Sequence, residues 1–82
     1  MKVEVFGADW CGPCRMLKGA LTRAGIEFEV IDIDSEPNKA AKDNIRGVPS
    51  TLVYDDQGKE VKRFVGFSTD LISKLKGLLD GK

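Results

Sequence analysis

The pentapeptide WCGPC, residues 10–14, contains both cysteines of this 82-residue chain. It follows a strand-like stretch and leads into a segment with helical periodicity. A thiol at such a junction lies beside unpaired backbone amides and the positive end of the helix dipole, and both stabilise the thiolate, the reactive form of cysteine. The spacing lets the two sulfurs meet, so Cys14 can resolve a mixed disulfide formed at Cys11. The pentapeptide therefore predicts a redox-active pair.

The other three residues of the pentapeptide fit this interpretation. Gly12 permits a tight turn into the helix, and Pro13 tolerates its missing amide hydrogen in the first turn. Trp10 offers a large apolar surface beside the attacking sulfur. These residues are expected to support the active site.

Three alternatives to a redox pair are weaker. A structural disulfide that closes a loop of two intervening residues would constrain the unfolded chain very little. A zinc site needs four ligands, and the chain has no histidine and no second cysteine pair. A chance pair of core cysteines would not explain the tryptophan, glycine and proline. The redox interpretation is favoured over all three.

The segments around the pentapeptide alternate between strand and helix patterns. Alternating valines predict a strand over 2–8, and a further strand is predicted over 26–34. Between them, 14–25 has one apolar helical face, ended by Gly25 as a left-handed cap. That face consists of Cys14, Leu17, Ala20, Leu21 and Ala24.

The second half of the chain predicts a short helix, a hairpin and a final helix. The short helix lies within 35–45, with Ser35 as its cap, Pro37 in its first turn and an apolar stripe of Ala40, Ala41 and Ile45. The hairpin joins strands over 48–55 and 59–65 through a turn at 55–58, with Pro49 at the very start of its first strand.

The final helix lies within 68–82. Ser68 is its expected N-cap, and Asp70 lies in its first turn, where the helix dipole favours a negative charge. Its apolar stripe is Leu71, Ile72, Leu75, Leu78 and Leu79.

The resulting order is β-α-β-α-β-β-α. The first βαβ unit requires parallel strands, and the last two strands form an antiparallel hairpin. We therefore expect an α/β fold with a mixed four-stranded sheet, helices on both faces and a single domain over 1–82.

Composition narrows the class of protein. Thirteen basic residues balance thirteen acidic ones, so no overall field attracts nucleic acid or an anionic membrane. No stretch approaches the ~20 apolar residues that span a bilayer, and no cleavable signal precedes the first strand. With at most one disulfide, the chain is unlike small secreted domains. We expect a cytoplasmic monomer.

At this point the chain resembles the thioredoxin–glutaredoxin superfamily. WCGPC matches the thioredoxin active-site motif, IRGVPST at 45–51 resembles the family's cis-proline loop, and FVGF at 64–67 resembles the glycine turn that faces the active site. The length is that of a glutaredoxin, so the chain looks like a mini-thioredoxin with a minimal thioredoxin-like fold.

The resemblance implies roles for individual residues. Cys11 would be the exposed nucleophile and Cys14 the buried resolving thiol. Pro49 would be the cis proline, and the backbone of Val48 would pair with an extended substrate segment. The apolar docking surface would comprise Trp10, Val48, Pro49, Gly66 and Phe67. The alternatives are a trans proline at the start of a strand and, for Phe67, a hydrophobic contact beside the Ser68 cap.

The chain also departs from both branches of the superfamily. Val5 stands where thioredoxins carry a buried aspartate, and Val30 where they carry the accompanying lysine, so Cys14 lacks the usual buried carboxylate. Asp9 takes a region that is commonly basic in glutaredoxins, and Gly66-Phe67 replaces a pair of glycines. These two changes weaken glutathione binding without excluding it.

The implied function is that of a dithiol–disulfide oxidoreductase that reduces protein disulfides. The cysteine pair itself carries the electrons, so no bound cofactor and no metal are expected. The implied partners are disulfide-containing proteins and an NADPH-dependent thioredoxin reductase or similar recycling enzyme. The alternatives are a glutathione-dependent glutaredoxin, a ribonucleotide-reductase electron donor, and a binding subunit that uses the apolar patch and not the thiols.

Overall fold

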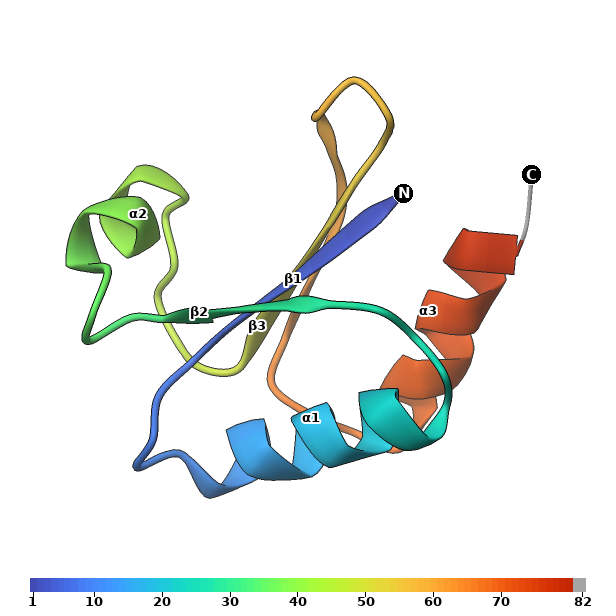
Figure 1. Ribbon diagram of the computed structural model, residues 1–82, viewed down its shortest axis with the longest axis horizontal. Helices are drawn as coiled ribbons and strands as arrows, with labels where there is room; N and C mark the ends of the chain where they lie inside the picture. The colour runs from blue at the N-terminus through green and yellow to red at the C-terminus, as the bar shows by residue number, and fades with distance from the viewer. Residues whose placement is uncertain (81–82) are drawn as a thin grey trace.

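The chain folds in the order β-α-β-α-β-β-α, as the sequence predicts (Figure 1). The computed structural model describes residues 1–80. Residues 81 and 82, which the sequence includes in the last helical segment, lie outside the described residues. The elements are β1 (Lys2–Gly7), α1 (Gly12–Arg23), β2 (Glu29–Asp32), α2 (Pro37–Lys42), β3 (Ser50–Tyr54), β4 (Glu60–Val65) and α3 (Asp70–Asp80).

The four strands form one mixed sheet in the order β2-β1-β3-β4. β1 runs parallel to β2 and antiparallel to β3, and β3 and β4 form the antiparallel hairpin. The predicted fold class is confirmed. Because β1 lies in the interior of the sheet, the loop that follows it emerges at the middle of one sheet end.

The two faces of β1 supply two separate hydrophobic clusters. Val3 and Val5 face α1 and α3, which pack on the same side of the sheet (Figure 1). Phe6 faces α2 on the other side. The larger cluster is Val3, Val5, Leu17, Leu21, Ile26, Val53, Leu71 and Leu75, and the smaller one is Phe6, Ile31, Ala40 and Leu52. The predicted α3 stripe points into the larger cluster, as do Leu17, Leu21 and Ala24 of the α1 stripe, whereas Cys14 belongs to a separate small cluster.

β2 begins three residues later than predicted, because residues 25 and 26 form the C-terminal cap of α1. Gly25 has φ 74°, the left-handed cap that the sequence predicts. Its amide donates to the Thr22 carbonyl, and the Ile26 amide donates to the Leu21 carbonyl. This pair of bonds is a Schellman motif, which commits Ile26 to the helix end.

Both predicted serine caps are wrong. α2 begins after Glu36 without a side-chain cap, and the amide of Ser35 donates to the Asp32 carbonyl in a turn that extends β2. The Ser68 hydroxyl donates to the carboxylate of Asp70, and no backbone amide among residues 1–80 donates to it, as the amides of a capped helix would. Within the predicted stripe of α2, Ala40 is buried but Ala41 is exposed.

Across residues 1–80, no helix combines the length and the apolar character that crossing a bilayer requires.

Candidate active site

The loop between β1 and α1 places Cys11 at the start of the helix. Cys11 is the N-cap of α1 and has an extended backbone, with φ −95° and ψ 107°. Its sulfur accepts a hydrogen bond from the Cys14 amide at 3.2 Å. The Cys11 amide donates to the Ala8 carbonyl at 3.1 Å, which closes the turn that leaves β1. The sulfur therefore occupies the amide-rich helix terminus that the sequence predicts.

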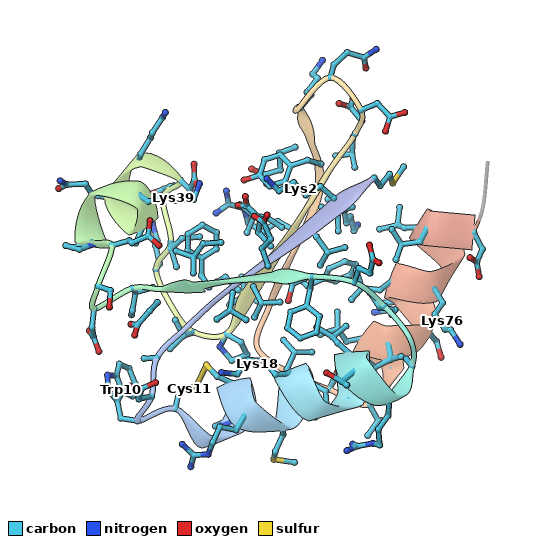
Figure 2. All side chains as sticks on the ribbon, in the orientation of Figure 1. Lys2, Trp10, Cys11, Lys18, Lys39 and Lys76 are labelled. Atoms are coloured by element: carbon cyan, nitrogen blue, oxygen red, sulfur yellow. A yellow bond between two sulfur atoms is a disulfide. The ribbon has the colours of Figure 1, made fainter. Side chains whose placement is uncertain are left out.

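Cys11 and Cys14 form a disulfide bond, and their Cα atoms are 5.3 Å apart (Figure 2). The bond joins two residues that are three positions apart at the start of the same helix, so it ties no distant parts of the chain together. Such a bond adds little to stability, since the loop that it closes is very short. Its value is chemical: the two sulfurs are placed to exchange.

The burial of the sulfurs corrects one prediction. Cys14 is fully buried, as expected, but Cys11 is only 5% exposed, where the resemblance implied an exposed nucleophile. The reason is local packing: both cysteines form a cluster with Ala8, against which Ile33 and Val48 also pack.

The glycine that the site requires is not the one predicted. A Cβ on Gly12 would meet no atom within 4 Å, so this position tolerates a side chain. A Cβ on Gly7, at the end of β1, would lie 3.2 Å from the Cys14 sulfur. Gly7 therefore allows the sulfur to lie directly against the sheet. Pro13 lies in the first turn of α1, as predicted.

Two loops that are distant in sequence are bonded to each other, and one of them meets the cysteines. The Val48–Pro49 peptide bond is cis, so the trans alternative is wrong. Pro49 is fully buried, and its carbonyl accepts a hydrogen bond from the Gly66 amide at 2.7 Å. Val48 packs against the cysteine cluster. Gly66 adopts φ 84°, a conformation that favours glycine.

The residues on either side of Gly66 differ. Phe67 is partly buried and packs against the larger hydrophobic cluster, so at least part of its ring belongs to the core. Val65 is 71% exposed and precedes Gly66 directly. The sequence analysis did not single out Val65, since an outward valine on an edge strand is unremarkable until the adjacent loop is located.

Trp10 is held by a contact that the sequence did not reveal. Its ring is 66% exposed, and its indole N–H donates to the Asp34 carboxylate at 2.9 Å. On the same loop, the Arg15 guanidinium donates to the Asp9 carbonyl at 2.6 Å. Asp34 lies 24 residues from Trp10, and no spacing rule in the sequence connects them. Only the parallel pairing of β1 and β2 places their loops at one sheet end.

Val5 stands where thioredoxins carry a buried aspartate, and the structure places this valine in the core. Val5 is fully buried in the larger cluster beneath α1. Its partner across the parallel pair is Val30, which is 49% exposed at the sheet edge. Among residues 1–80, no three His, Cys, Asp or Glu side chains cluster in a way that could hold a metal ion.

Comparison with known proteins agrees with this geometry. The family model Thioredoxin matches residues 2–77. The SPbeta prophage-derived thioredoxin-like protein YosR of Bacillus subtilis is 42% identical over 65 residues, which cover 79% of this chain and 81% of the relative. A thioredoxin of Chlamydia trachomatis is 39% identical over 66 residues, with 74% of this chain and 64% of the relative covered. This chain is therefore shorter than some of its relatives.

A similar arrangement occurs in solved structures. Thioredoxin 1 from Thermosipho africanus superimposes with a TM-score of 0.81 at 29% identity, over 98% of this chain and 96% of that one. A thioredoxin from Nicotiana alata is 34% identical with a TM-score of 0.79, over 94% of this chain and 70% of that one.

Proposed function

The chain belongs to the thioredoxin family, and from that premise we propose that it works as a reductant of protein disulfides through a reversible Cys11–Cys14 cycle. The family's chemistry is thiol–disulfide exchange, and the paired cysteines fit it. The single observation that supports the proposal most is the bond between these two sulfurs at the N-terminus of α1. It adds little as a structural crosslink and is placed where a thiolate is stabilised.

The cycle balances without a bound cofactor. The Cys11 thiolate attacks one sulfur of the substrate disulfide, and the other sulfur leaves as a thiolate. Cys14, once deprotonated, attacks the Cys11 sulfur and breaks the mixed disulfide, so that the second substrate sulfur leaves with its electron pair. Two electrons have then moved to the substrate, and Cys11–Cys14 is oxidised.

The surface around the sulfurs suits an extended protein segment. Trp10, directly before Cys11, and Val65, directly before Gly66, are both exposed. Val48 packs against the cysteines, and the Gly66 amide donates to the carbonyl of the adjacent Pro49. We expect the backbone of Val48 to pair with the substrate as an added strand, while the apolar side chains cover its flanks. Phe67 contributes less than the other members, because part of its ring packs in the core.

For recycling, we favour an NADPH-dependent thioredoxin reductase over glutathione. The exposed Asp9 near the cysteines repels the carboxylates of glutathione, and Phe67 adds bulk after Gly66. A cytoplasmic location and a monomeric state complete the proposal, since a reductant needs a reducing compartment and its small site must remain accessible.

The test is reduction of a disulfide-containing protein such as insulin, with dithiothreitol or thioredoxin reductase and NADPH as the electron source. We expect turnover by the natural sequence and its loss in Cys11→Ser. Cys14→Ser should accumulate a mixed disulfide at Cys11, visible by mass spectrometry. Efficient recycling by glutathione alone would favour a glutaredoxin, and biological function retained without both cysteines would favour a binding subunit.

A further inference from the structure

The structure raises the question of which group accepts the proton of Cys14. This thiol is fully buried in the disulfide form, and in the cycle it must become a thiolate before it can attack. Val5, the nearest inward residue of β1 before Gly7, is apolar and buried. A different group must therefore accept the proton of Cys14.

The Cys14 sulfur lies against Gly7. A Cβ at Gly7 would be only 3.2 Å from this sulfur, so the sulfur packs on the same side of the sheet as a side chain at position 7 would. That side is the α1 side, because Val5 alternates in phase with position 7 and packs against Leu17 and Leu21.

The residue beside Gly7 in the sheet is Asp32, its partner in the parallel pairing of β1 and β2. Its neighbour Ile31 packs in the cluster on the α2 side, so Asp32 points to the α1 side, toward which the sulfur lies. Neighbouring strands are about 4.8 Å apart, so the half-buried carboxylate and the sulfur lie on the same side of two adjacent strands.

The Asp32 carboxylate has one oxygen engaged. Its Oδ1 accepts the Asp34 amide at 2.8 Å, which fixes the orientation of the group. No hydrogen bond to Oδ2 is recorded within residues 1–80, so this oxygen is available to a water on the sulfur side. An oriented carboxylate with an available oxygen has the geometry of a proton acceptor.

The other acidic groups near the site are less well placed. Asp34 is exposed and bonded to the Trp10 indole, and Asp9 is exposed on the turn after β1. Glu4 and Tyr54 lie on the opposite face of the sheet, beside α2. β3 presents no ionisable side chain at its start, where its residues are Ser50 and Thr51.

The basic groups that face this region come from α1. Lys18 follows Cys14 by one turn and is half-buried, and Figure 2 shows it on the sheet side of the helix. Arg15 is exposed and holds the Asp9 carbonyl.

We propose that Asp32 accepts the proton of Cys14 during resolution of the mixed disulfide. The Cys14 proton passes through one water to Asp32 Oδ2, and the sulfur, now a thiolate, attacks Cys11. The bond between Cys11 and the substrate breaks, the substrate sulfur leaves with its electron pair, and Asp32 returns the proton through water to that thiolate. This inference rests on the proposed function, since it requires turnover of disulfides.

The test is the variant Asp32→Asn. Asparagine keeps an oxygen for the Asp34 amide but cannot accept the proton, so the turn is expected to fold. At pH 7 we expect roughly a hundredfold loss of disulfide-reduction rate, at the low end of what general bases contribute. The loss should shrink above about pH 9, where the thiol ionises without help.

A second readout separates proton transfer from electrostatics. In a Cys11→Ser background, the thiolate absorbance near 240 nm reports the pKa of Cys14. Removal of a neighbouring negative charge by Asp32→Asn should lower this pKa. A lower pKa with a slower reaction is the signature of a lost base, because electrostatics alone would make the reaction faster.

Asp9→Asn is the matched control, since it removes one negative charge from the same end of the sheet. It should leave the rate and the pH profile unchanged. If Asp32→Asn behaves like Asp9→Asn while the natural sequence turns over, only the role of Asp32 is overturned. If the natural sequence reduces no disulfide, the proposed function itself fails.

A measurement on the unaltered protein covers the case in which Asp32→Asn does not fold. In the reduced protein, the ¹³C shift of the Asp32 carboxyl should show a second titration step at the pH where Cys14 ionises, and the oxidised protein should lack this step. An identical titration curve in both redox states would overturn the proposal.

Discussion

The two faces of the sheet are held to their helices in different ways. On one face, eight buried residues from the strands, α1 and α3 form a continuous apolar cluster. On the other face, the buried cluster has four residues, of which three come from the strands and one, Ala40, comes from α2. The helix that carries the cysteines therefore has the larger apolar support.

Charges supply part of what the smaller face lacks. Glu4 is 5% exposed, and its Oε1 lies 3.7 Å from the Lys39 ammonium. The same ammonium lies 3.4 Å from Asp43 and 5.8 Å from the centre of the Phe6 ring. Lys39 thus links α2 to the strand beneath it.

This difference in attachment indicates that α1 must be held more rigidly than α2. Disulfide exchange requires α1 to present two sulfurs at a fixed spacing, so its position depends on close packing, which is insensitive to salt and pH. α2 contacts neither sulfur directly, and its ionic attachment is weaker and depends on conditions. Each prediction below tests this contrast, and the largest effect comes first.

Leu21→Ala should be the most destabilising change. Leu21 is fully buried in the larger cluster, and its truncation removes apolar contacts and leaves a cavity, at a cost of about 2–5 kcal/mol. Urea unfolding followed by far-UV circular dichroism measures the loss.

Leu52→Ala deletes the same atoms from the other face and provides the comparison. Leu52 is fully buried as well, but the six-residue α2 above it can shift toward the cavity, so the cost should be smaller. An equal or larger loss for Leu52→Ala would contradict the idea that the α1 face is the more tightly packed one.

Lys39→Met should cost about 1 kcal/mol of unfolding free energy. The methionine keeps an apolar stem over Phe6, but among residues 1–80 it leaves the Lys2 ammonium, at 3.5 Å, as the one cation paired with the buried Glu4. The full cost of a broken buried pair is not expected, because Lys39 is 39% exposed. Urea unfolding at low and high salt checks both the size and the screening of the effect.

Lys74→Met is the control for Lys39→Met. Lys74 pairs with Asp70 on the surface of α3, where both side chains are about 60% exposed, so its removal should cost less than about 0.5 kcal/mol. Equal losses for the two lysines would mean that Glu4 gives the α2 contact no special strength.

The sequence predicted the fold well because each signal was local. Periodicity located every strand and helix, and Gly25 marked the end of α1. The predicted start of β2 failed because a Schellman motif depends on backbone bonds that residue types do not show. Ser35 and Ser68 were misassigned as caps for a similar reason, since their hydrogen bonds were decided by the turns around them.

Only part of the active site could be predicted from the sequence. The cysteine pair and the cis Pro49 follow from short motifs. The contacts of Trp10 with Asp34 and of Gly7 with Cys14 depend on which strands are neighbours, and alternation within one strand does not contain that information. The alternating pattern of this strand does not show that Glu4 is buried, because its burial depends on the placement of α2.

Tyr54 gives an effect that is confined to alkaline pH and is the most specific to the α2 face. It packs against the smaller cluster, where burial, followed by the negative charges of Glu4, Asp43 and Glu60, raises the pKa of its phenol to about 12. In the unfolded chain the phenol ionises near pH 10. Between these two values the unfolded state loses its proton and the native state keeps it, so stability falls as pH rises.

Tyr54→Phe should therefore remove part of the alkaline loss of stability. At pH 11 the natural sequence should have lost on the order of 1 kcal/mol more than the phenylalanine variant, relative to pH 8. Lysine deprotonation is common to both proteins and cancels in this comparison. Since the chain has one tyrosine, phenolate absorbance near 295 nm reports this residue alone. A phenol that titrates near pH 10 in the native protein would show that the α2 face is open to water and that its acidic side chains do not act on Tyr54.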